Sequence, residues 1–185
     1  MGMVSEVDRT GMAASLEEVK AYLRITGTEE DEGLSALLRG AEALCEQFVG
    51  QWLIVRTALE TVAVGSDGGW RRLTARPVLA IEAVETVDGA DGSGDGTPLP
   101  VDAYAIDIDA NGDGWVRIAR PVAATLVRVR YRAGLASGMD GLPEALRQGI
   151  VRLAADHYLA RGRDSATPPA VVSALWRPWR RMRLA

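Results

Sequence analysis

The sequence has 185 residues, 48% of them hydrophobic, and this length and composition suit one globular domain with a sizeable core. A formal net charge of −4 makes the protein as a whole a poor general binder of nucleic acid. The single cysteine excludes an intrachain disulfide framework, and no apolar run reaches the roughly 18 residues of a transmembrane helix.

The first predicted element is a short helix that follows a loose segment. We expect residues 1–14 to form a flexible N-terminal arm. Ser15 and Glu18 have the spacing of a capping box, in which each side chain accepts a hydrogen bond from the backbone of the other residue. This spacing predicts a helix over 15–26.

A second and longer helix is predicted over 31–50. The acidic residues at 29–32 are expected to cap this helix and to interact favourably with the positive, N-terminal end of its dipole. Gly50 is expected to end the helix. Apolar residues recur along it with helical period, so one face should pack in the core. This stripe consists of Leu34, Leu37, Leu38, Ala41, Leu44, Cys45 and Phe48.

From about residue 53 to residue 133 the apolar residues alternate with period two, which predicts β-strands. The candidate strands are 53–64, 70–75, 79–87, 103–108, 115–118 and 125–132. Turns rich in Gly and Asp separate them, and the stretch at 88–96 is a flexible loop by composition. We therefore expect an antiparallel β insertion at about 53–133.

Within this insertion, DIDANGDG at 107–114 matches the first half of a calcium-binding loop. The residues at its positions 1, 3, 5 and 7 are Asp107, Asp109, Asn111 and Asp113. Position 12 is Ile118, which offers no oxygen, and the flanking residues alternate as strands do. Asn-Gly and Asp-Gly are hairpin signals, so we predict a β-hairpin. A calcium-regulated module is the rival, and it predicts a calcium-dependent melting temperature.

Helical periodicity returns after Pro143, which suits the first turn of a helix, and predicts a third main helix over 142–162. A hinge at 163–169 and a last short helix should follow. The chain should bend at Pro178, because proline has no amide hydrogen and its ring clashes with the preceding helical turn.

The predicted fold class is α+β: a small helical bundle with an antiparallel β insertion between the second and third main helices and an extended C-terminal arm. We expect the flexible arm at 1–14, a single α+β domain at 15–167, and a short C-terminal helix with a basic and aromatic docking tail at 168–185.

The sequence offers no recognisable catalytic site. His157 and Cys45 are the only residues of their types, and each lies on an apolar helical stripe, which favours structural roles. One cysteine and one histidine cannot build a structural zinc site within one chain. No GxSxG, Walker A or HExxH motif occurs. We therefore predict no catalytic residue, no cofactor, no metal ion and no enzymatic activity.

The ending WRPWRRMRLA differs from ordinary surface, because it carries four arginines and no acidic residue. Trp and Arg are enriched at interface hot spots, so this composition predicts a docking segment. The predicted docking residues are Trp176, Arg177, Pro178, Trp179, Arg180, Arg181, Arg183 and Leu184.

A family resemblance joins these segments. In order they read SLEEVKAYLRI, DEGLSALLRGAEALCEQFVGQWL, YAIDID with WVRI, VRVRYRAG, LPEALRQGIVRLAADHYLARG and ALWRPWRRMRL. From residue 15 onward the chain resembles the head–tail adaptor (connector) proteins of long-tailed bacteriophages, prophages and gene transfer agents. The resemblance rests on segment order and loose patterns.

The resemblance implies a structural virion protein. Such proteins form a ring, usually a dodecamer, beneath the portal; the ring extends the DNA channel and joins the capsid to stopper and tail proteins. The implied partners are the portal protein, stopper or tail proteins and further copies of the chain. Genomic double-stranded DNA would pass through the lumen without specific binding, and no membrane is involved.

The resemblance also implies a location in the virion neck after assembly in the host cytoplasm, with the C-terminal segment at 170–185 docked on the portal. Two alternatives stay open. One is a stopper or tail-completion protein of the same neck. The other is a DNA-binding protein that uses the Arg-rich tail, which predicts salt-sensitive binding of duplex DNA.

Overall fold

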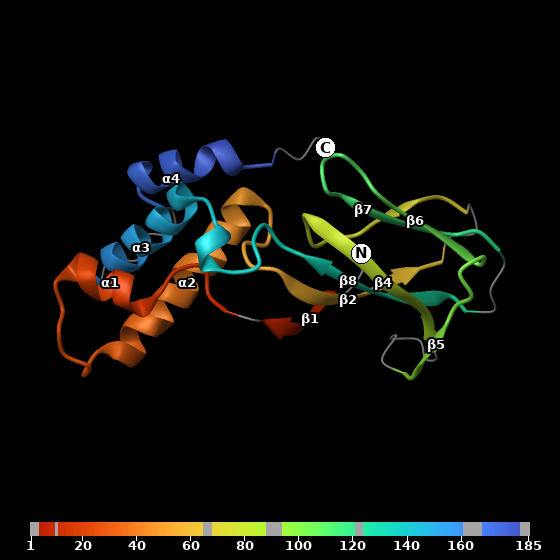
Figure 1. Cartoon of the computed structure of the whole chain (residues 1–185), viewed down its shortest axis with the longest axis horizontal. Coiled ribbons are helices and arrows are strands. Elements are labelled where there is room, and N and C mark those ends of the chain that lie inside the picture. Colours follow the sequence, from red (N-terminus) through yellow and green to blue (C-terminus); the bar gives the residue numbers. More distant parts are fainter. Residues whose placement is uncertain are drawn as a thin grey trace. The chain divides into compact units, whose positions relative to one another are not determined.

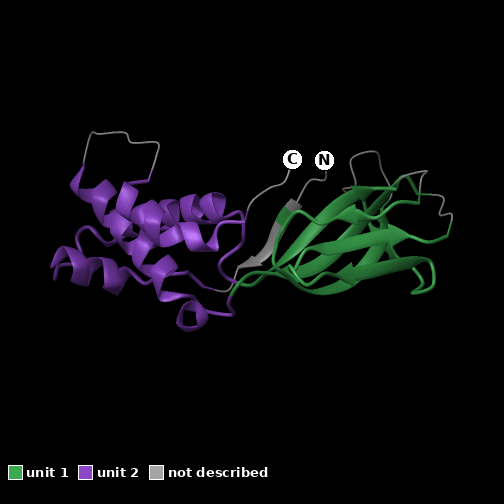
Figure 2. Ribbon diagram, turned by 90° about the horizontal axis from the view of Figure 1, so that it is seen from above, with its two compact units in different colours: residues 1–10, 55–135 green, residues 11–54, 136–185 purple. Residues whose placement is uncertain are grey.

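The computed structural model describes residues 4–9, 11–64, 68–87, 94–120, 124–160 and 168–181. The chain forms two compact units (Figure 2). We call residues 1–10 with 55–135 the β unit, and residues 11–54 with 136–185 the helical unit. Helices occur with antiparallel sheets, so the predicted α+β class is confirmed. The described strands fall between the second and third main helices, except for the strand Val4–Arg9, which precedes the first helix.

The helical unit is a small bundle, seen in Figure 1. Its α-helices are α1 (Leu16–Leu23), α2 (Asp31–Val49), α3 (Glu144–Leu159) and α4 (Ala170–Trp176), with 3-10 turns at Met139–Gly141 and Arg177–Trp179. Helices α2 and α3 each pack against the other three helices. These two helices therefore form the centre of the bundle.

The helix ends follow the local sequence closely. The Oγ atom of Ser15 accepts from the Glu18 amide at 3.1 Å, and Glu18 accepts from the Ser15 amide at 2.8 Å, so the predicted capping box is confirmed. Gly50 ends α2 in the left-handed region at φ 71°, which glycine adopts without strain. The predicted side-chain cap of α2 is wrong, because its N-cap residue Glu30 makes no side-chain capping bond, but the predicted acidic first turn is present as Asp31 and Glu32.

The core of the helical unit lies between α2 and α3. On α2 the buried members of the predicted stripe are Leu34, Leu38, Ala41 and Cys45, while Leu37, Leu44 and Phe48 are half-buried. The residues of α3 that complete the core are Leu146, Ile150, Leu153 and Ala154. The predicted core stripe is therefore confirmed in its central part.

The β unit contains two antiparallel sheets. Its strands are β1 (Val4–Arg9), β2 (Arg56–Ala63), β3 (Arg71–Arg72), β4 (Val78–Val87), β5 (Gly96–Pro98), β6 (Tyr104–Ile108), β7 (Gly114–Ile118) and β8 (Leu126–Ala133). One sheet has the order β1-β2-β8-β4-β5, and the other has the order β3-β7-β6.

Strand register explains which residues are buried. Alternate residues of β2 and β8 face the core, and Ala58 lies opposite Tyr131 in this row. The two sheets meet where the Val78 side chain lies over Gly114, leaving no room for a Cβ there. The core of the β unit thus lies between the sheets.

A buried polar network ties the strands of the β unit together. The Tyr131 hydroxyl donates to Glu60 at 2.7 Å and accepts from the Ala75 amide at 3.0 Å. The amide and the hydroxyl of Thr74 donate to the same carboxylate at 2.8 and 2.7 Å. Burial, and then the neighbouring Glu60 charge, raise the pKa of Tyr131 well above its ordinary value.

Two segments differ from their predicted states. Residues 4–9, expected within a flexible arm, instead form β1 and pair with β2. The pairing satisfies backbone groups that an edge strand would otherwise leave exposed. Part of the predicted loop at 88–96 contributes to β5, while 88–93 lie outside the described residues. Of the predicted hinge, 163–167 also lie outside them.

Candidate functional site

Helix α4 is held to the bundle by Trp176. The indole is fully buried, and its Nε1 donates to the Leu146 carbonyl at 3.3 Å. Its ring centroid lies 5.7 Å from that of Phe48 on α2. The predicted role of Trp176 as a docking residue is therefore corrected: a side chain inside the core of its own chain is not available to a partner.

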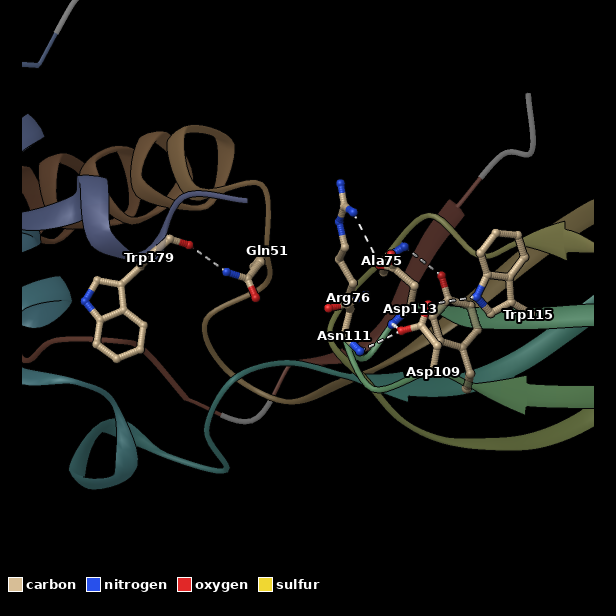
Figure 3. A network of polar contacts seen from close by, with 9 residues as sticks. Gln51, Ala75, Arg76, Asp109, Asn111, Asp113, Trp115 and Trp179 are labelled. Carbon is tan, nitrogen blue, oxygen red and sulfur yellow. Dashed lines mark hydrogen bonds and ion pairs between the residues drawn. The ribbon is translucent and has the colours of Figure 1, made fainter. Parts of the chain in front are cut away.

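Residues 177–181, which we call the C-terminal strap, follow this helix. Helix α4 ends at Trp176 and Pro178 lies in the next 3-10 turn, so the predicted break is confirmed. The strap does not turn away from the protein. Gln51 Nε2 donates to the Trp179 carbonyl at 2.8 Å (Figure 3), and the Arg181 amide donates to the Val49 carbonyl at 3.0 Å.

The strap shows its side chains to solvent although its backbone is held. Arg177, Pro178, Trp179 and Arg180 are exposed, and Arg181 is half-buried. Arg183 and Leu184 lie outside the described residues. The Arg180 guanidinium lies 5.5 Å from the centroid of the Phe48 ring, near the C-terminal end of α2, where positive charge is favourable.

The DIDANGDG segment forms the predicted hairpin, with β6 and β7 paired around residues 109–113. Asp109 organises the turn, accepting from the Asn111 amide at 2.8 Å, the Asp113 amide at 3.0 Å and the Trp115 indole at 3.3 Å (Figure 3). Gly112 adopts φ 73°. Asp113 forms an ion pair with Arg76 at 3.3 Å. These carboxylates are used in shaping the turn.

The two remaining residues with possible catalytic chemistry, Cys45 and His157, lie in helices of the bundle. Burial raises the pKa of the Cys45 thiol, which favours its unreactive protonated form. His157, which was placed on an apolar helical stripe, is half-buried on α3. Within the described ranges, no group of three or more His, Cys, Asp and Glu side chains could hold a metal ion. None of the described helices combines the length and the apolar character needed to cross a membrane.

A second surface was not recognised in the sequence. We call it the Trp/Arg face; it consists of the exposed Trp70 and Arg72 together with the half-buried Trp115 and Arg117. These side chains lie on the side of the three-stranded sheet opposite to the buried Val116. In the sequence, the Trp and Arg residues of this face appear in the separate segments WRR and WVR. Only the pairing of β3 with β7 brings these two segments together.

Comparisons with known proteins agree with the predicted resemblance. Residues 13–85 match the family model described as phage gp6-like head-tail connector protein. No curated protein matches the sequence.

Solved structures match nearly the whole chain. One, the neck of an empty GTA particle computed with C6 symmetry, has 28% identity and a TM-score of 0.79 over 99% of this chain and 97% of that chain. The virion of a native gene transfer agent particle has 27% identity and a TM-score of 0.73, with the same coverage. The neck of a native GTA particle computed with C12 symmetry has 25% identity and a TM-score of 0.69, again with that coverage. The resemblance to head–tail connector proteins is thereby confirmed.

Proposed function

We propose a specific place for this chain in a tailed particle: it is a structural neck protein of the head–tail connector kind, and within the neck it forms the adaptor ring beneath the portal. The carrying observation is the match to neck chains over 99% of this chain, which includes both the helical unit and the β unit. A match of this extent supports the same role for the whole chain rather than for one module.

A ring is supported by the symmetry of the similar structures, which are necks computed with C6 and C12 symmetry. Twelve copies would be compatible with both symmetries, so we propose a dodecamer. Each subunit of a closed ring must offer two different complementary patches to its neighbours. The net charge of −4 suits a conduit through which DNA passes without being gripped, because phosphate contacts create affinity.

The proposed role is structural rather than enzymatic. It is supported by the connector family match and by side chains that serve the fold: the Cys45 thiol is buried, and the Glu60 carboxylate is bonded within the β unit. The partners we propose are the portal protein on one side of the ring and stopper or tail proteins on the other.

For contact with the portal we propose the C-terminal strap with the residues that follow it. Its exposed Trp179, Arg177 and Arg180 combine an apolar side chain with two charges that can pair with portal carboxylates. Because the strap backbone is bonded to Gln51 and Val49, its position is set before docking. Less conformational entropy is then lost on binding than with a disordered tail.

The test is reconstitution with DNA-filled heads that lack this protein. We expect the wild-type protein to form a ring on the portal and to restore tail attachment, as seen by cryo-electron microscopy. The variant Trp179→Ala with Arg180→Ala should fold normally but fail to bind heads. Density in the tail tube or below a second ring would instead assign the chain to the stopper or tail-completion role.

The DNA-binding alternative has its own measurement. Binding of duplex DNA by the isolated protein that falls steeply with salt, and that is lost in the same strap variant, would favour that alternative. An adaptor whose lumen only conducts DNA should show no such binding at physiological salt.

A further inference from the structure

The Trp/Arg face continues onto the neighbouring strand β6, which adds a carboxylate to it. Trp115 on β7 lies directly opposite Arg72 on β3, and on its other side it lies opposite Asp107 on β6. One row across the three strands therefore carries a positive charge at the β3 edge, an aromatic ring in the middle and a negative charge at the β6 edge.

The adjoining row of the same face changes in size instead of charge. Arg117 on β7 lies opposite Ala105 on β6. On the side of β3 its guanidinium lies 5.0 Å from the centroid of the Trp70 ring, a contact that cation–π attraction favours. This row therefore has a large side chain at the β3 edge and only a methyl group at the β6 edge.

The side chains at the two edges are available to a partner. Arg72 and Asp107 are exposed, and neither of them forms an ion pair within the described part of the chain. Trp70 keeps 41% of its surface exposed. Between them, Trp115 is fixed by the bond from its indole to Asp109. Aromatic side chains that are already ordered lose little entropy when they bind, which is typical of interface hot spots.

A row that runs from positive through aromatic to negative is its own complement after a half-turn about an axis along β7. Arg72 of one copy then faces Asp107 of the other, twice in the contact, and each Trp115 faces its counterpart. The same half-turn places Trp70 over Ala105, so a large side chain meets a small one. A partner of one charge sign, such as nucleic acid, would leave one edge of the row against like charge.

We propose that two copies of this chain associate face to face through this surface, about a two-fold axis along β7. Such a contact uses the same patch on both copies, which requires a self-complementary surface. Stacked sheets lie about 10 Å apart, a gap that an arginine and an aspartate reaching from opposite sides can bridge. Arg117 lies near the axis, but its attraction to the Trp70 ring draws its guanidinium toward β3 and away from its counterpart.

The proposed dimer is a property of the free protein. Neighbours in a ring meet head to tail, whereas this contact has two-fold symmetry, so the inference does not depend on the proposed ring. The few side chains of the face are well below the about 20–30 residues a side of a standard stable interface. We therefore expect a reversible dimer with a Kd in roughly the micromolar range.

Charge reversal in the full chain tests the pairing, with the Kd measured by sedimentation equilibrium. Arg72→Glu or Asp107→Arg turns both ion pairs into like-charge contacts and should raise the Kd by about tenfold or more. The double variant, Arg72→Glu with Asp107→Arg, exchanges the charges and should dimerise nearly as wild type does. Arg130→Glu, at an exposed arginine on β8 outside the face, is the matched control and should leave the Kd unchanged.

Mixing the two single variants gives a test specific to two-fold symmetry. At the two edge positions one variant carries only carboxylates and the other only guanidinium groups. Each should be largely monomeric alone, and an equal mixture should form a heterodimer that native mass spectrometry identifies by its mass. Ala105→Phe should also prevent dimerisation, because its ring fills the space that Trp70 of the second copy requires. Melting curves of each variant show that it is folded.

Several results would overturn the proposed dimer. A wild-type protein that stays monomeric up to its solubility limit is one, and a dimer unaffected by both single charge reversals is another. Single variants that do not pair on mixing, together with a monomeric double variant, would also exclude it. Duplex DNA binding by a monomeric wild type, lost in Trp70→Ala, would assign the face to nucleic acid instead. All these measurements use the free protein, so they leave the test of the adaptor role on heads independent.

Discussion

The indole of Trp176 packs directly against Gly149, so that a Cβ added at Gly149 would lie 2.8 Å from Cδ1 of the indole and overlap its Nε1. Gly149 is buried in the middle of α3, where glycine is otherwise unfavourable. Its missing side chain makes room for Trp176, and this contact closes α4 onto the bundle.

Gly149→Ala should therefore destabilise the protein although alanine is the better helix former. Overpacking of this kind costs about 1–3 kcal/mol, which exceeds the gain of roughly 1 kcal/mol in helix propensity. Gly40→Ala is the matched control, because nothing lies within 4 Å of a Cβ there. It should raise the unfolding free energy by about 0.5–1 kcal/mol. Urea titration of both variants checks the prediction, and equal stabilisation by both would contradict it.

The two C-terminal tryptophans should behave differently. Trp176→Ala empties a buried site and should lower the unfolding free energy by about 3–5 kcal/mol. Trp179→Ala, at a surface position, should change it by about 0.5 kcal/mol or less and should instead reduce head binding. Thermal melts with a head-binding assay separate the two effects.

The same reasoning fixes where a truncation can begin. Deletion of 176–185 would remove a side chain of the core together with the strap. Because Trp176 belongs to the core, deletion of 177–185 is the version that should stay folded while losing head binding. Equal melting temperatures for both deletions would contradict the assigned role of Trp176.

Tyr131 should make the stability of the protein fall at high pH. Its pKa is raised in the folded state by burial and by Glu60, so the folded protein holds this proton more tightly than the unfolded chain. The contribution is complete below the unfolded pKa of about 10 and is lost progressively as the pH rises above it. The unfolding free energy of wild type should therefore fall more between pH 9 and about 11 than that of Tyr131→Phe. Parallel curves would refute this assignment.

Asp109 should stabilise the hairpin without calcium. Asp109→Ala removes the acceptor of three hydrogen bonds and should cost about 1–3 kcal/mol. Asp107→Ala, at an exposed position on β6, is the control and should have little effect. Melting curves with and without calcium should coincide for wild type. A calcium-dependent increase that Asp109→Ala abolishes would revive the calcium-module interpretation.

The sequence by itself determined the features that depend on neighbours along the chain. The Ser15–Glu18 capping box, the end of α2 at Gly50 and the hairpin between β6 and β7 follow from local spacing and backbone preference. The core stripe of α2 follows from helical period. The segment order that carries the family resemblance is likewise a property of the linear chain.

Only the tertiary structure decided which residues of the basic C-terminal segment are exposed and which are buried. The sequence presents Trp176 and Trp179 as similar members of one basic tail, but Gly149 and Phe48 offer a packing site to Trp176 alone. The Trp/Arg face requires that β3 pair with β7, a contact between segments more than 40 residues apart. Such pairings depend on the packing free energy of the whole unit, because no local preference of the chain encodes which distant strand will be the neighbour.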